Sequence, residues 1–203
     1  MKIFVDYENE FYEEKYKKLG YCITIIDNSY HYFYEFDINN DLAYVRSNDY
    51  KYIEDAIDLF RKNRLYINQI KSIDGNFYAN YDKIHKFKLP IKILQPSKFF
   101  LDEQKIDDFD KYLNIDDVCI PVCIINDEYV IISGHTIVYT LNMNYKKMID
   151  VYIDDYDPLI NDLVYIAKEH NIKDINGMHK LSHEEYETYW NNIINEIKNT
   201  EEF

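Results

Sequence analysis

The sequence predicts a mixed α+β protein in which strands and helices alternate along the chain. Strand-favouring residues at 129–132 run into Gly134, and a helical pattern follows at once at 135–141. Of 203 residues, 47% are hydrophobic and only four are glycine, a composition typical of a globular chain with a packed core. A chain of this length can form one large or two small domains.

Residues 1–87 are predicted to form a small α+β unit. A charged, tyrosine-rich helix is expected at 8–19, because Gly20 is a typical helix-terminating residue. Runs that favour strands follow at 21–26, 30–38 and 42–46. Alternate positions of the second run are aromatic, which predicts a face buried in the core, with a binding platform as the alternative.

A second helix and a hairpin complete this unit. The helix is expected at 49–64, and its apolar stripe consists of Ile53, Ala56, Ile57 and Phe60. Strand-like runs on either side of Asp74 and Gly75 predict a β-hairpin. We identify no catalytic constellation in residues 1–87.

A second domain is expected at 88–154, and its boundary falls in a Lys- and His-containing stretch that ends at Pro90. A short helix opens near 101–106, and strands are predicted at 120–125 and 149–153 on either side of the Gly134 turn. This domain therefore contains the strand-to-helix turn and the chain segments around it.

The motifs of this domain resemble those of the ParB/sulfiredoxin-like superfamily. The resemblance covers about 89–154 and rests on the Gln95-Pro96-Ser97 segment, an Ile-Pro-Val strand and a Ser-Gly-His-Thr turn. It is closest to bacterial ParB-like proteins with a D-G-H-T-R-like turn. The resemblance implies a ParB/sulfiredoxin-like domain that carries an N-terminal α+β extension and a C-terminal helical cap.

The Gly134 turn is the candidate phosphate- or nucleotide-binding site. Glycine permits a close approach to the main chain, and the first N–H groups of a helix attract an anion. The candidate binding residues are Ser133, Gly134, His135, Thr136 and Lys98. The alternative is a tight strand-to-helix turn that holds no ligand.

Departures from the resembled family predict that this site is weakened. The family turn reads G-E-R-R or G-C-H-R, so His135 stands at the position of the sulfiredoxin cysteine and Ile137 at that of a phosphate-gripping arginine. Ser97 replaces a further arginine, and no arginine follows Arg64. Lysine binds phosphate as a point charge without arginine's planar fork, so Lys98 is a weaker substitute.

Two residues are weak candidates for catalysis. Glu103 loosely matches an acidic residue that helps to position metal or substrate in the resembled kinases and CTPases, which implies a nucleotide with magnesium as the cofactor. An acidic residue in the first turn is also favourable for the helix dipole alone. His135 could act as a hydrogen-bond donor or general acid beside an anion, or simply as a turn residue.

Residues 155–203 are predicted to form a helical segment. Asp157 and Pro158 are typical of a helix start, and Ser182 with Glu185 fits a capping box. The last helix has a wide apolar face made of Tyr186, Tyr189, Trp190, Ile193, Ile194 and Ile197. This face is expected to pack on the preceding domain, on a protein partner or on a second copy of the chain.

Charge and cysteine content narrow the function classes. The net charge is −14, and residues 91–154 carry 6 basic and 11 acidic residues, which disfavours nucleic-acid binding. The sequence shows no signal peptide or membrane-spanning run, so we expect a cytoplasmic protein. Three cysteines cannot form a complete set of internal pairs, Cys119 and Cys123 are expected to be buried, inert thiols, and no zinc-ligand spacing is recognised.

Three functional hypotheses follow. The leading one is a non-catalytic binding or regulatory module with a weakened nucleotide or phosphate site. The alternative is a phosphotransferase or CTPase that depends on ATP or CTP and uses Lys98, Glu103, His135 and Thr136. A DNA-binding, partition-like factor is the third, and the charge disfavours it.

Overall fold

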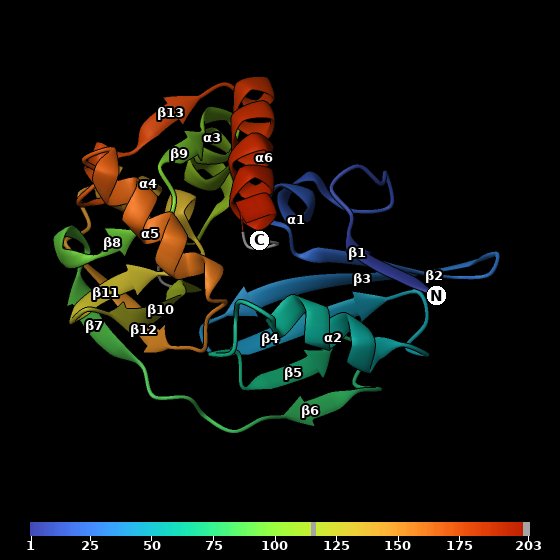
Figure 1. The fold of residues 1–203 in the computed structure, drawn as a ribbon. Helices are drawn as coiled ribbons and strands as arrows, with labels where there is room; N and C mark the ends of the chain where they lie inside the picture. The colour runs from blue at the N-terminus through green and yellow to red at the C-terminus, as the bar shows by residue number, and fades with distance from the viewer. Residues whose placement is uncertain (115–116, 201–203) are drawn as a thin grey trace. The chain divides into compact units, whose positions relative to one another are not determined.

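The chain is an α+β protein with an N-terminal α+β unit and a helical C-terminal segment (Figure 1). The computed structural model describes residues 1–114 and 117–200, without the side chains at 191 and 194–200. The chain packs as two compact units. Unit 1 comprises Met1–Lys86 with Tyr112–Cys119, and unit 2 comprises Phe87–Lys111 with Ile120–Phe203.

Unit 1 is built on a six-stranded sheet in the order β1-β2-β3-β4-β5-β6. Its strands are β1 (Lys2–Val5), β2 (Cys22–Asp27), β3 (Tyr30–Asn39), β4 (Leu42–Ser47), β5 (Gln69–Ser72) and β6 (Tyr78–Asn80). Neighbouring strands are antiparallel except β4 and β5, which run parallel. The predicted strands and the hairpin at Gly75 are confirmed.

The aromatic face of β3 lies in the core, as predicted. Tyr32, Tyr34 and Phe36 are buried, whereas Tyr30 at the start of the strand is exposed. Phe36 stacks on Phe60 at a centroid distance of 4.0 Å. Phe60 lies in α2 (Ile53–Arg61), whose buried residues are the predicted stripe.

The first helix is shorter than the sequence suggested. α1 spans Glu14–Leu19 and ends at Gly20, which has a φ of 66°. The expected start at residue 8 is wrong, because the Asp6 carboxylate accepts hydrogen bonds from the N–H groups of Glu8 and Asn9 and forms a turn there. An Asp side chain that binds nearby N–H groups competes with helix formation.

Unit 2 contains a five-stranded sheet in the order β7-β12-β10-β11-β8. These strands are β7 (Phe87–Pro90), β12 (Met148–Ile153), β10 (Cys119–Ile125), β11 (Glu128–Ile131) and β8 (Gln95–Pro96). The 3₁₀-helix η1 (Ile91–Ile93) separates β7 from β8. The strands predicted at 120–125, 129–132 and 149–153 are confirmed.

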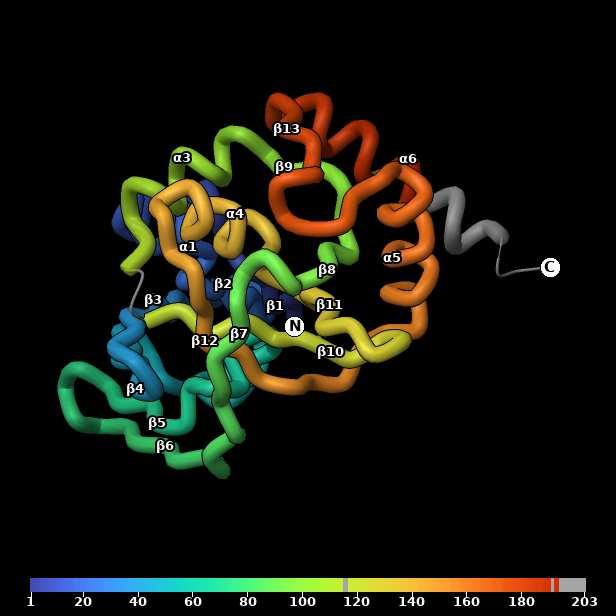
Figure 2. Tube along the Cα trace, turned by 90° about the vertical axis from the view of Figure 1, so that its left-hand side faces the viewer, coloured from blue at the N-terminus to red at the C-terminus, as the bar shows by residue number. Residues whose placement is uncertain are grey.

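Unit 2 also contains the later α-helices of the chain. They are α3 (Glu103–Tyr112), α4 (His135–Met143), α5 (Leu159–Glu169) and α6 (His183–Thr200). α5 lies against β10 and β11, where Val164 packs on Cys123 and Val130 (Figure 2). The short strands β9 (Phe100–Asp102) and β13 (His179–Leu181) pair in parallel, after the 3₁₀-helix η3 (Ile175–Gly177).

The C-terminal helices begin where the sequence predicts. The Asp157 carboxylate accepts a hydrogen bond from the Leu159 N–H. Ser182 and Glu185 form the capping box, since the Ser182 N–H donates to the Glu185 carboxylate and the Glu185 N–H donates to Ser182 Oγ. On the predicted apolar face Tyr186 is buried, and Ile194 and Ile197 lie outside the described side chains.

Candidate functional site

The turn between β11 and α4 has a conformation that requires glycine. Gly134 has a φ of 87°, and a Cβ added there would lie 2.7 Å from Cδ1 of Ile120. α4 begins directly after it, and no described side chain caps its first turn. The first N–H groups of a helix have no partner within the helix, so those of α4 remain available to an anion.

The His135 side chain lies inside unit 2. Its exposed fraction is 4%, and its Nε2 accepts a hydrogen bond from the Ser97 N–H at 3.0 Å. The Ser97 hydroxyl donates to the Ile131 carbonyl at 2.7 Å and lies 3.2 Å from the same Nε2. Nε2 is therefore an acceptor, and this pattern assigns a neutral imidazole with its proton on Nδ1.

Burial favours this neutral form of His135. Burial lowers the pKa of the imidazole well below its usual value, and the nearby charge of Lys98 lowers it further. Charging a buried imidazole costs free energy because the charge loses its hydration. His135 therefore holds Ser97 against the start of α4, and its Nε2 does not face a ligand at the turn.

Ser133 and Thr136, the other polar residues of the turn, are both half-buried. The Thr136 carbonyl accepts a hydrogen bond from the Thr140 hydroxyl at 2.9 Å, within α4. The structure thus brings Ser133, Gly134 and Thr136 together at the N-terminus of α4, with the His135 ring turned inward.

Lys98 lies close enough to affect His135, but aromatic residues of α6 surround its ammonium group. Its Nζ donates to the Tyr186 hydroxyl at 3.2 Å and lies 4.6 Å from the centre of the Trp190 ring. Burial, together with the neighbouring charge of Lys105, lowers the pKa of Lys98 to about 8. Among the residues that the structure describes, no carboxylate forms an ion pair with Lys98.

The acidic pair at the start of α3 has two different environments. Glu103 is exposed, whereas Asp102 has an exposed fraction of 1%. The Asp102 carboxylate accepts hydrogen bonds from the Gln104 N–H at 3.0 Å and from His183 Nδ1 at 2.7 Å. Sequence reasoning gave no role to His183, and the only signal was its position directly after the capping-box serine.

The cysteine side chains lie in the interior of the protein. Cys119 and Cys123 are buried, as predicted, and so is Cys22; none of the three forms a disulfide bond. Burial raises the pKa of Cys123 to about 11, so its thiol is unreactive at neutral pH.

Within residues 1–114 and 117–200, no three His, Cys, Asp or Glu side chains converge as a metal-binding group. None of the described helices combines the length and apolar character needed to cross a membrane.

Comparison with known proteins finds similarity to solved structures over part of the chain. No family model and no curated protein matches the chain. The crystal structure of protein Atu1540 from Agrobacterium tumefaciens matches with a TM-score of 0.36 and 12% identity, over 47% of this chain and 62% of that one.

A second solved structure is the C-terminally truncated chromosome-partitioning protein ParB from Caulobacter crescentus, complexed with CTP-γ-S. It matches with a TM-score of 0.32 and 21% identity, over 43% of this chain and 53% of that one. The present chain thus spans less than two thirds of either structure, and its resemblance to ParB-like proteins is one of sequence motifs.

Proposed function

We propose that unit 2 is a ParB/sulfiredoxin-like binding or regulatory module that holds a phosphate group weakly and catalyses no reaction on it. The observation that supports this proposal is the uncapped N-terminus of α4, directly after Gly134. The charge of Lys98 lies close enough to this terminus to lower the pKa of His135. An anion at this terminus would accept hydrogen bonds from main-chain N–H groups and from Thr136.

The site is weak because it lacks guanidinium groups. Each lost charge-assisted hydrogen bond costs about 1.5–3 kcal/mol, which corresponds to roughly one to two orders of magnitude in affinity. Lys98 must also leave Tyr186 and Trp190, or share its ammonium group with them, to reach a phosphate. We expect dissociation constants of roughly 0.1–10 mM for nucleotides.

The contacts of the two catalytic candidates favour a binding role. A general base needs a free acceptor within hydrogen-bond reach of the proton that it removes. The Nε2 of His135 already accepts from Ser97, and the Glu103 side chain is exposed at the surface. Neither residue is arranged to move a proton at the α4 terminus.

A nucleotide-dependent phosphotransferase or CTPase is the second candidate, and one observation favours it. Buried Asp102 binds Nδ1 of His183 and thereby fixes the tautomer and orientation of that ring. Carboxylate–histidine pairs of this kind orient general bases and metal ligands in enzymes. In that case magnesium would accompany the nucleotide.

A thermal-shift titration of the full chain distinguishes these functions. CTP, ATP, ADP and pyrophosphate are each added with and without magnesium, to wild type and to Thr136→Ala, Lys98→Met and Lys92→Met. Lys92 is exposed on η1 and is a matched control for the loss of one lysine charge. We expect small, saturable shifts that Thr136→Ala and Lys98→Met reduce and Lys92→Met leaves unchanged.

Other outcomes would contradict the proposal. Micromolar, magnesium-dependent binding together with nucleotide turnover would establish the enzyme instead. Salt-dependent retention on duplex DNA would favour the partition-like factor. Shifts that do not change in Thr136→Ala and Lys98→Met would place the phosphate elsewhere.

A further inference from the structure

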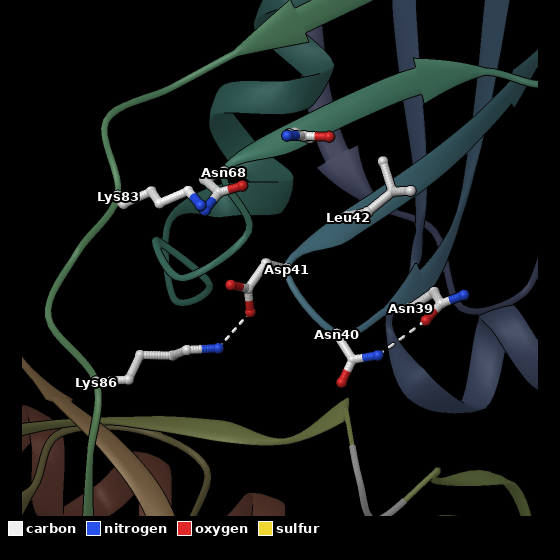
Figure 3. Close-up of a pocket in the computed structure, with 8 residues that line it drawn as sticks. Asn39, Asn40, Asp41, Leu42, Asn68, Lys83 and Lys86 are labelled. Atoms are coloured by element: carbon white, nitrogen blue, oxygen red, sulfur yellow. Dashed lines mark hydrogen bonds and ion pairs between the residues drawn. The ribbon is translucent and has the colours of Figure 1, made fainter.

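Unit 1 contains a polar hollow, and none of the residues that line it belongs to the candidate site at α4 (Figure 3). Its volume is about 440 Å³. The β3–β4 turn, the start of β5 and the segment after β6 contribute its walls. Four amide side chains line it: Asn39, Asn40, Asn68 and Gln69.

Asn68 is the most buried of these four amide residues. Its exposed fraction is 4%, and its side-chain amide has no hydrogen-bond partner among the described residues. Its main chain is fixed, because the Asn68 N–H donates to the Asp41 carbonyl at 2.9 Å and its carbonyl accepts from the Tyr81 N–H at 2.8 Å. The amide of Asn68 lines the hollow, where a bound acceptor and donor would pair with its N–H group and its oxygen.

The charges around the hollow leave one cation unpaired. Lys86 forms an ion pair with Asp41, whereas Lys83 has no ion-pair partner in the described part of the chain. Figure 3 shows the Lys83 side chain extending toward Asn68. Lys83 therefore gives the hollow one cationic group without an ion pair to any described residue, beside the amide of Asn68.

The β3–β4 turn is held in position without a ligand. Asn40 has a φ of 56°, and its N–H donates to the Asp117 carboxylate at 2.6 Å. The Asn40 Nδ2 donates to the Asn39 side-chain Oδ1 at 3.0 Å. A wall that is already ordered lowers the entropic cost of binding.

We propose that this hollow binds a small, hydroxyl-rich molecule with one anionic group, of the sugar-acid or sugar-phosphate class. Amides offer both a donor and an acceptor, which suits hydroxyl groups, and Lys83 would bind the anionic group. The Asp41 carboxylate can accept from a further hydroxyl. A bare anion would use only Lys83, and a neutral sugar would use only the amides and Asp41.

Calorimetric titration of the full chain tests this inference. The probes are glucuronate, a hexose phosphate, glucose and inorganic phosphate. All titrations are made in the Lys98→Met background, which weakens the binding of phosphate at the α4 terminus. The variants are Asn68→Leu and Lys83→Gln, with the exposed Lys62→Gln as the matched control in the same unit.

We expect glucuronate, the hexose phosphate or both to bind, and which of them binds more tightly identifies the anionic group. Asn68→Leu and Lys83→Gln should each weaken this binding by about tenfold or more, and Lys62→Gln should not change it. Glucose and inorganic phosphate should each bind at least about tenfold more weakly than the better probe.

Three results would overturn the proposal. One is the absence of saturable binding for both anionic sugars. Another is binding that neither Lys83→Gln nor Asn68→Leu weakens. The third is inorganic phosphate binding as tightly as the hexose phosphate, which would indicate a bare anion site. Lys83 is exposed, so Lys83→Gln remains informative if Asn68→Leu does not fold.

Discussion

The buried Nε2 of His135 accepts a hydrogen bond from the main-chain N–H of Ser97 at 3.0 Å. The two residues are 38 positions apart, and their bond joins the segment after β8 to the first residue of α4. The bond requires an unprotonated Nε2. The stability of unit 2 should therefore depend on pH through this histidine.

Unfolding at mildly acidic pH should be easier because of His135. Its pKa is lowered in the folded state, so below about pH 6.5 the unfolded chain binds a proton that the folded chain does not. The free energy of unfolding should fall by up to about 1.4 kcal/mol per pH unit as the pH drops below this value. Urea denaturation of wild type and His135→Gln between about pH 5 and 7 measures the difference in slope.

The matched control for this prediction is His31→Gln. His31 is exposed on β3, so His31→Gln measures the effect of replacing one surface histidine. An identical slope in wild type and His135→Gln would show that His135 titrates freely in the folded state.

Gly134→Ala should destabilise the protein through two separate effects. The φ of 87° is strained for alanine by about 1–3 kcal/mol, and the new Cβ would also contact Ile120 Cδ1. Ile120→Val removes that methyl group. In a double-mutant cycle followed by urea denaturation, Gly134→Ala should therefore cost less in the Ile120→Val background, without becoming neutral.

Gly177→Ala provides the comparison. Gly177 does not need a positive φ, and a Cβ there would lie 3.4 Å from the Ile172 Cα. Its replacement should change the free energy of unfolding by less than about 1 kcal/mol. Equal costs at Gly134 and Gly177 would contradict a special role for the turn.

The sequence predicted the elements whose signals are local. Gly20, Asp157 and the Ser182 capping box are each recognised within a few residues, and the structure has a helix end or start at all three. The start of α1 was wrong because the Asp6 carboxylate satisfies nearby N–H groups, and composition cannot distinguish that turn from a first helical turn.

The contacts of the site residues could not be predicted in the same way. Residues 133–136 are adjacent in sequence, so their meeting at one turn needed no tertiary information. The inward rotation of His135 depends on Ser97, and the partner of Asp102 lies 81 positions away. Such long-range pairs depend on how strands and helices pack, and one sequence without related sequences does not contain that information.

Lys98→Met should stabilise the protein at neutral pH. The folded pKa of Lys98 is about 8, below the ordinary value of 10.5, so protonation favours the unfolded chain. Its penalty is fully present below about pH 8 and fades as the pH rises toward 10.5. Methionine keeps much of the aliphatic stem against Trp190, so the gain should come from removing the charge.

Urea denaturation of wild type, Lys98→Met and Lys92→Met at about pH 7 and pH 10 checks this expectation. The gain in unfolding free energy should be larger at the lower pH for Lys98→Met and near zero for the exposed Lys92→Met. If Lys98→Met destabilises the protein at both pH values, the contacts with Tyr186 and Trp190 outweigh the cost of burying the ammonium group.

The Asp102–His183 bond should connect β9 energetically to the start of α6. β9 and β13 pair in parallel and place Asp102 opposite Leu181, so His183 reaches the carboxylate at 2.7 Å. Asp102→Asn retains an oxygen for the Gln104 N–H, and His183→Ala removes only the partner ring. Because the His183 side chain is 52% exposed, we expect a coupling free energy of about 1 kcal/mol, which a double-mutant cycle by urea denaturation measures.

The Glu128–Lys168 ion pair is a suitable control, because both of its side chains are exposed in the same unit. Its coupling should be about 0–0.5 kcal/mol, since water screens both charges. A buried carboxylate loses that screening and depends more on its partner. A coupling for Asp102–His183 no larger than that of Glu128–Lys168 would mean that the main-chain N–H groups, with the Lys105 ammonium group at 3.8 Å, stabilise the buried carboxylate without His183.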